Sequence, residues 1–200
     1  MKKLRQLSAV TTILALLLLT GCSGSLKHMQ LVESDAVQDS PSAGKSMVVF
    51  MRPSTLGFAV QSSVFNVTGG DPELVGLMPA KHKMAYELEP GKHLFMAIGE
   101  SADFMHADLA ANKTYYALVT PRMGAWKARF SLAPVKAAQL GGDEHEKWLD
   151  SCQWIEKSDT SDEWAQTNMT SILAKQKKYY PPWLKKPEED QPRLDPQDGR

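Results

Sequence analysis

Short apolar runs bounded by turn-forming residues constrain the fold of this chain more than any other feature of its sequence. The separators between the runs are rich in Gly, Pro, Asn, Asp and Ser, which is typical of hairpin turns. The separators leave no room for the crossover helices that a parallel sheet usually requires. The pattern therefore predicts an antiparallel β-sandwich or a small barrel. The runs cover residues 47–52, 60–67, 73–77, 83–88, 92–98, 102–109, 113–120 and 125–135.

Alternation of side chains within the runs indicates strands with one wet face. From residue 126 to residue 132 the even-numbered side chains are apolar and the odd-numbered ones are polar. Leu94, Met96 and Ile98 form a second row of this kind. Because successive side chains of a strand point to opposite faces, each row predicts a core-facing side. We expect residues 46–135 to form one mainly β domain, an antiparallel β-sandwich.

A helical extension is predicted for residues 136–183. A short helix over 143–149 has an acidic first turn, and residues 152–156 return as a strand. A longer helix begins at Thr160, where Thr160 and Glu163 fit a capping box, and Pro181 and Pro182 are expected to end it. Its apolar side should cover the sheet. Residues 184–200 combine prolines with charges, so we expect a disordered tail.

The first 21 residues have the layout of a removable leader. A basic head precedes an apolar run over 9–19, which is too short to cross a hydrocarbon core about 30 Å thick. Residues 19–22 (Leu-Thr-Gly-Cys) resemble a bacterial lipobox, which implies cleavage between Gly21 and Cys22 and acylation of the Cys22 sulfur. A cysteine at this junction disfavours an uncleaved anchor or an ordinary secretory signal. Acyl chains such as palmitate would then hold the protein on a membrane without a spanning helix.

The sequence after the lipobox also predicts where the protein is located and how its body is tethered to the lipid. Ser23 stands where an Asp would favour inner-membrane retention, so we expect the outer membrane, with the body facing the periplasm. Residues 22–45 are polar and small, which favours a lipidated flexible tether. Lipidation of Cys22 would leave Cys152 without a partner in the chain, and we interpret Cys152 as a buried thiol. Loss of the leader removes three of the 23 basic residues against 23 acidic ones, so no nucleic-acid partner is expected.

Three motifs in the middle of the chain are similar to a known family. Residues 48–53 (Val-Val-Phe-Met-Arg-Pro), 88–93 (Leu-Glu-Pro-Gly-Lys-His) and 111–116 (Ala-Asn-Lys-Thr-Tyr-Tyr) resemble a bacterial lipoprotein family with a domain of unknown function. That family is broadly similar to the PEGA type of small β module. The resemblance covers about residues 46–135, and Asn112 stands where the family usually has glycine. The resemblance implies a β-sandwich fold and a location in the cell envelope. It implies no catalytic residue, because the family has no established ones.

Aromatic residues supply the candidate binding positions. Tyr115 and Tyr116 face opposite sides of one strand, so one ring should fill the core and the other should lie under the helix. With Trp126 they could stack on a sugar or a lipid at the end of the sandwich. Trp183 follows Tyr180 and two prolines, which allows an extended polyproline segment, or a folded-back helix end in which Trp183 packs on the sheet.

Residue patterns for catalysis and metal binding are weak. Residues 99–103 (Gly-Glu-Ser-Ala-Asp) lack the second glycine of a nucleophile elbow and are better interpreted as a hairpin turn. His82, His93, His106 and His145 lack metal-ligand spacing, so we expect no metal site. We therefore expect no enzyme and no cofactor.

The expected function is that of a non-catalytic, lipid-anchored cell-envelope protein. Our first hypothesis is a protein-binding or assembly module that faces the periplasm and acts on an envelope partner. The alternative is binding of a small molecule, a lipid or a cell-wall glycan in a pocket at the end of the sandwich.

Overall fold

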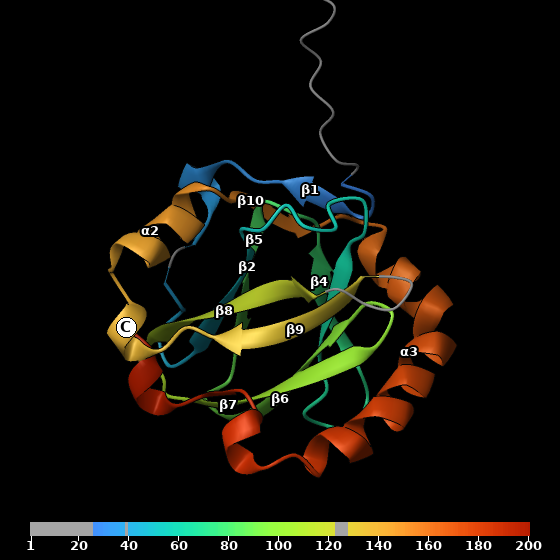
Figure 1. The fold of residues 1–200 in the computed structure, drawn as a ribbon. Coiled ribbons are helices and arrows are strands. Elements are labelled where there is room, and N and C mark those ends of the chain that lie inside the picture. The colour runs from blue at the N-terminus through green and yellow to red at the C-terminus, as the bar shows by residue number, and fades with distance from the viewer. Residues whose placement is uncertain (1–25, 39, 123–127) are drawn as a thin grey trace, which may run out of the picture.

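Two β-sheets form the body of the protein in a computed structural model that describes residues 26–38, 40–122 and 128–200. The first sheet has the order β1-β10-β5-β2-β8-β9, and the second has the order β11-β7-β6-β3-β4 (Figure 1). The strands of the first sheet are β1 (Met29–Leu31), β10 (Gln153–Lys157), β5 (His82–Leu88), β2 (Ser46–Arg52), β8 (Lys113–Arg122) and β9 (Arg129–Pro134). Those of the second are β11 (Arg193–Leu194), β7 (Ala102–Leu109), β6 (Gly91–Ile98), β3 (Ser62–Asn66) and β4 (Glu73–Met78).

The prediction of a mainly β chain is confirmed, but the prediction of purely antiparallel sheets is wrong. Strand β2 runs parallel to β8, β10 runs parallel to β5, and β11 runs parallel to β7. A crossover helix is not needed between β2 and β8, because the chain between them builds most of the second sheet and returns. The remaining pairs are antiparallel, as short hairpin connections dictate.

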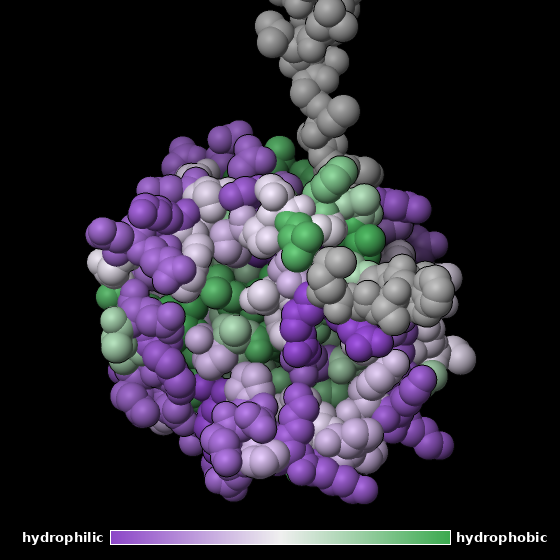
Figure 2. Space-filling view, in the orientation of Figure 1, coloured by the Kyte–Doolittle hydropathy of each residue, from purple (hydrophilic) through white to green (hydrophobic). Residues whose placement is uncertain are grey.

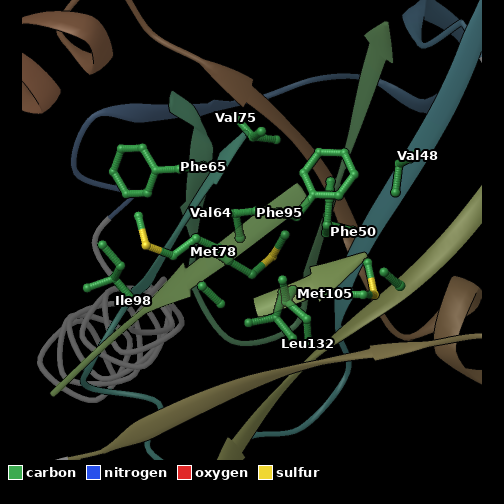
Figure 3. Packing of buried hydrophobic residues seen from close by; sticks show 14 of the residues in the cluster. Val48, Phe50, Val64, Phe65, Val75, Met78, Phe95, Ile98, Met105 and Leu132 are labelled. Carbon is green, nitrogen blue, oxygen red and sulfur yellow. The ribbon is translucent and has the colours of Figure 1, made fainter. Parts of the chain in front are cut away.

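One hydrophobic core joins the two sheets. Val48 and Phe50 of β2 point into it, and the Phe50 ring meets the edge of the Phe95 ring of β6 with 5.1 Å between centroids. Figure 3 shows side chains of both sheets meeting there. Strand β2 is buried over its whole length, because its opposite face, with Met47 and Val49, contributes to a second cluster. A strand covered on both faces is expected to be continuously apolar, as 47–51 is.

Two helices lie on opposite sides of the sheets (Figure 1). Helix α2 (Asp143–Asp150) contacts β2 beside the second cluster. Helix α3 (Ser161–Leu184) contacts β7, β4 and β6, with Ala165 and Ile172 buried against the core. Of the apolar positions on this helix, Ala165 and Ile172 are buried, whereas Leu173 is 42% exposed. Short 3-10 turns complete the elements: η2 (Ser34–Ala36), η3 (Ala137–Gln139), η4 (Glu188–Asp190) and η5 (Pro196–Asp198).

The start of α3 differs from the predicted capping box. Thr160 precedes the helix but makes no capping hydrogen bond, and its hydroxyl instead lies 2.9 Å from Nδ1 of His28. The Ser161 hydroxyl accepts the Ser158 amide at 2.9 Å and donates to the His28 carbonyl oxygen. The predicted capping box is therefore wrong, because the Thr160 hydroxyl pairs with His28, just ahead of β1, instead of capping the helix.

The end of α3 differs as well, since Pro181 and Pro182 lie inside the helix rather than beyond it. A proline removes the hydrogen bond to the carbonyl four residues earlier. Here those carbonyls belong to Lys177 and Lys178, which are exposed and can be hydrated. Trp183 is buried against β7 and holds the last turn in place.

The predicted disordered tail, 184–200, is wrong. Strand β11 pairs with β7, and Leu194 is fully buried. The Asp198 carboxylate accepts hydrogen bonds from Lys136 Nζ at 2.8 Å and from the Ala137 amide at 3.1 Å. Composition alone suggested disorder, but these side chains and backbone hydrogen bonds such as those between Arg200 and Thr114 hold the segment against the sheets.

The predicted flexible tether over 22–45 is wrong from Leu26 onward. Strand β1 pairs with β10, and Met29 is buried in the core. Room for Met29 exists because Gly76 has no side chain: a Cβ there would lie 3.1 Å from Met29 Cε and 2.5 Å from Met84 Sδ. Residues 22–25 and residue 39 lie outside the described residues.

Two turns behave as the sequence indicates. Gly91 has a φ of +123° at the start of β6, a backbone conformation that glycine adopts without strain. Asn112 has a φ of +60°, which is the left-handed conformation that Asn tolerates best after glycine. Asparagine at position 112 is therefore compatible with a tight turn between β7 and β8.

Candidate functional site

A fully buried arginine lies at the end of β2. Nη1 of Arg52 donates to the carbonyl oxygens of Val60 at 2.7 Å and Met78 at 3.1 Å. Nη2 donates to the carbonyl oxygens of Leu56 at 3.0 Å and Gly57 at 2.8 Å. Burial lowers the pKa of Arg52 to about 10, which still leaves the guanidinium charged near neutral pH. Three of the four acceptors belong to residues 53–61, so this side chain fixes the backbone of the loop between β2 and β3.

The loop held by Arg52 points apolar side chains outward. Leu56, Phe58 and Val60 are 51%, 74% and 40% exposed, and Leu31 of β1 is 55% exposed. We call these four side chains the loop patch. Exposed apolar side chains on a structured loop commonly mark a contact surface, because single exposed hydrophobes rarely gather without function.

A cavity of about 910 Å³ lies between this loop and α3, and we call it the α3 cavity. It opens at the end of the sheets where the β6–β7 hairpin and the ends of β8 and β9 meet. Its walls carry apolar side chains of the loop, of β6 and of α3, namely Leu56, Val60, Ile98, Trp164 and Ile172.

Polar groups form part of the lining of the α3 cavity. Lys175 Nζ donates to the Gly99 carbonyl oxygen at 2.5 Å, so it ties α3 to the β6–β7 hairpin. Glu100 forms an ion pair with Arg129 at 3.5 Å. Asn168 donates to the Trp164 carbonyl oxygen at 2.8 Å. These contacts fix an amphipathic concave surface in which polar groups lie beside apolar walls.

A second cavity of about 960 Å³ lies on the other side of the loop, and we call it the β1 cavity. Val60 and Gln61 line both cavities, so the loop separates them. Leu26, Leu31 and Phe58 contribute apolar surface to the β1 cavity. Lys27 and Lys81 are exposed beside them.

The aromatic residues predicted for binding are buried instead. Tyr115 lies in the main core, where its hydroxyl accepts the Ala110 amide at 2.7 Å, and burial raises its pKa. Tyr116 meets the edge of the His145 ring with 4.6 Å between centroids, so the helix above it is α2. Trp183 packs on Phe104 with 5.7 Å between centroids.

Burial disfavours a binding role for Tyr115 and Tyr116, and neither lines the α3 or β1 cavity. Trp183 is also buried but lines a smaller pocket of about 360 Å³, so its binding role stays a prediction. The alternative in which Trp183 folds back onto the sheet is the one found, and the extended polyproline segment is absent at 179–183. Trp126, Gly21 and Cys22 lie outside the described residues.

The titratable groups singled out in the sequence occupy structural positions. Residues 99–101 form the hairpin between β6 and β7, with the Gly99 amide donating to the Ser101 carbonyl oxygen at 2.9 Å. Cys152 is buried, and burial raises the pKa of its thiol, in agreement with the buried-thiol interpretation. Burial also lowers the pKa of His145. The His145 ring packs against Tyr116, and its Nδ1 accepts the Gly141 amide at 3.2 Å. Within the described residues, no group of three or more His, Cys, Asp or Glu side chains is arranged to hold a metal ion.

Sequence reasoning missed Arg52 and the loop patch as functional candidates. Arg52 was noted only as part of the 48–53 motif. Its role depends on backbone carbonyl oxygens that only the folded chain brings around its guanidinium, and no sequence pattern marks these acceptors. A signal existed in residues 56–60 (Leu-Gly-Phe-Ala-Val), an apolar stretch that directly follows the Pro53 turn. The predicted strand over 60–67 left residues 56–59 without an element, and in the structure the whole stretch lies ahead of β3, which begins at Ser62.

The comparisons with known proteins do not add a family. No protein-family model matches the chain, and no curated protein sequence matches it.

Proposed function

We propose that this protein is a non-catalytic, lipid-anchored β-sandwich of the bacterial cell envelope that binds an amphipathic small molecule or lipid in the α3 cavity. The observation that carries the proposal is the cavity itself. Its volume of about 910 Å³ lies within the range of about 300–1,000 Å³ common for small-ligand sites. Apolar walls with a few fixed polar groups are the usual composition of such sites.

Binding fits the polar groups of the α3 cavity better than catalysis does. Lys175 and Glu100 are engaged with the Gly99 carbonyl and with Arg129, so both serve the structure of the cavity wall. Among the described residues, none of the buried groups with a shifted pKa lines this cavity; these groups are Arg52, His82, Lys83, Tyr115, His145, Cys152 and Asp198. A general acid or base would need to reach the bound molecule.

The lipid anchor is supported by the sequence of the leader. An apolar run of sub-membrane length ends at a small residue pair followed by Cys22. The described helices include none that is both long and apolar enough to span a bilayer. We propose cleavage before Cys22, acylation of its sulfur, and residence on the periplasmic face of the outer membrane. Mass spectrometry of the N-terminal peptide tests this directly, since an intact leader or an unmodified Cys22 would contradict it.

Ligand binding is tested by filling the α3 cavity. Ser171 lines the cavity from α3, whereas neighbouring Thr170 is exposed and does not line it. We expect Ser171→Trp to reduce the fluorescence gain of N-phenyl-1-naphthylamine several-fold, and Thr170→Trp to leave it unchanged. Equal probe binding by both variants would contradict the site.

A protein partner is the second candidate function. The exposed loop patch favours it, because apolar patches on soluble surfaces often contact other proteins. Chemical crosslinking in intact envelopes, followed by purification of the acylated protein, should recover one reproducible partner. Repeated failure to recover any would remove this candidate.

A further inference from the structure

The folded body begins close to the site of the lipid anchor. Leu26 is the first described residue, and it lines the β1 cavity together with Phe58. Its neighbours are fixed, since the Met29 amide donates to the Leu26 carbonyl oxygen at 2.9 Å and β1 starts at Met29. The chain therefore enters the fold at the loop patch rather than at a remote edge.

The length of chain between Cys22 and Leu26 limits how far the body can move from the membrane. Four residue steps, fully extended, reach at most about 14 Å. The tether expected from composition was more than twenty residues long and would have allowed the body any orientation. With the shorter connection, whatever surface surrounds Leu26 is held next to the lipid headgroups.

The surface around Leu26 has the composition of a membrane-contact site. Leu31, Phe58 and Val60 expose apolar area there, and Figure 2 shows hydrophobic side chains gathered on this side of the molecule. Lys27 and Lys81 are exposed at the same cavity and carry the charge that anionic headgroups attract. Apolar side chains flanked by lysines are typical of surfaces that lie at the boundary between headgroups and acyl chains.

We propose that the loop patch, with Phe58 at its most exposed point, inserts into the headgroup region of the leaflet that holds the acyl chains of Cys22. This inference rests on the lipid anchor of the proposed function. A bilayer is favoured over a protein partner, because the gap of about 14 Å at full extension leaves little room for a second folded protein beside Leu26. The anchor also keeps the patch at high effective concentration next to lipid.

Arg52 makes this insertion possible as a positioning residue. Its hydrogen bonds to the carbonyl oxygens of Leu56, Gly57 and Val60 fix the loop backbone from inside. Phe58, which lines the β1 cavity, is then held at 74% exposure. A loop already ordered before contact loses less conformational entropy when it binds.

The test uses the acylated full-length product reconstituted into protein-free vesicles of phosphatidylethanolamine with a minor fraction of phosphatidylglycerol. Phe58→Cys is labelled with the environment-sensitive fluorophore NBD. Leu173→Cys is the control, because Leu173 is also an exposed apolar side chain, at 42% exposure, but lies on α3 outside both cavities. Labelling of the parent protein measures the background from buried Cys152.

We expect the label at position 58 to emit at shorter wavelength and to be reduced by dithionite several-fold more slowly than the label at 173. Equal emission and equal reduction at the two positions, in protein that floats with the vesicles, would overturn the proposal. A label at 58 that is shielded in native envelope fragments but not in pure lipid would also overturn it, in favour of a protein partner. Failure of the anchor itself is distinguished separately, because unacylated protein would not float and would lack the acyl mass.

Discussion

The guanidinium carbon of Arg52 lies 4.7 Å from the centre of the Phe130 ring. This contact places the end of β2 against β9, while the same guanidinium holds the loop over 53–61 through carbonyl oxygens. One side chain thereby joins the core, the wall of the α3 cavity and the loop patch. The stability of the fold and the shape of the proposed binding surfaces consequently depend on the same residue.

Replacement of Arg52 should destabilise the protein strongly. Arg52→Met retains the length of the side chain but leaves the carbonyl oxygens of the loop without their donor. We expect a loss of about 2–4 kcal/mol in the free energy of unfolding, measured by chemical denaturation. Arg193→Met is the matched control, because Arg193 is an exposed arginine on β11, and it should change stability by less than about 0.5 kcal/mol. Equal effects would show that Arg52 does not organise the loop.

Gly91 should not tolerate a β-branched side chain. No atom lies within 4 Å of a Cβ built at Gly91, so any cost of Gly91→Val arises from its φ of +123°. We expect a loss of more than about 1 kcal/mol. Gly69→Val is the control, since Gly69 has equal space and no positive φ. If both variants melt at the same temperature, backbone strain does not explain the glycine.

The start of α3 should depend on Ser161 rather than on Thr160. Ser161→Ala removes the acceptor for the Ser158 amide and the donor to the His28 carbonyl, and we expect a cost of about 1–2 kcal/mol. Thr160→Ala should cost less than about 0.5 kcal/mol, because its exposed hydroxyl caps no helix amide. Urea denaturation followed by circular dichroism compares the two. A larger loss of stability for Thr160→Ala than for Ser161→Ala would instead support the capping box at Thr160.

The C-terminal segment should stabilise the protein through Asp198 in a pH-dependent way. Burial would raise the pKa of Asp198, but hydrogen bonds from Lys136 and from the Asp195 and Ala137 amides outweigh it, so the pKa lies below its ordinary value of 3.8. A carboxyl with a depressed pKa contributes stability above its unfolded pKa and loses it as the pH falls through the folded value. Asp198→Asn should therefore cost about 1–3 kcal/mol at neutral pH.

The cost of Asp198→Asn should shrink once the pH falls below about 4, because the wild-type carboxyl then begins to lose the same contribution. Denaturation curves at a series of pH values measure the difference. Glu188→Gln is the control, since Glu188 is exposed, and it should show little effect at any pH. A difference for Asp198→Asn that stays constant into strong acid would contradict the assigned charge interaction.

Local patterns predicted most of the strands and helices, because those patterns depend on neighbours in sequence. The alternation at Leu94, Met96 and Ile98 indicated β6, and the glycine of the 88–93 motif indicated the turn before it. The fate of Thr160 could not be inferred in this way. Its hydroxyl had two possible partners, a helix amide nearby and His28 far away in sequence, and only the folded chain brings the second within reach.

The candidate site was less predictable than the fold. A pocket at the end of the sheets was among the expectations, but Tyr115 and Tyr116 were expected to line it and both are buried. The sequence alone does not distinguish an aromatic side chain that packs in the core from one that is exposed for ligand binding. The loop patch was hidden for the opposite reason, since apolar residues next to a strand are ordinarily assigned to the core.

By itself, the sequence determined the β-rich class and the turn at Gly91, because both follow from residue type and spacing along the chain. The tertiary structure alone decided that β2 pairs with β8 in parallel, that Arg52 reaches the carbonyl oxygens of the loop, and that β1 and β11 pair with strands of the two sheets. These features depend on contacts between residues distant in sequence. These contacts contribute to stability only once folding brings the partners together, so a local sequence pattern does not predict them.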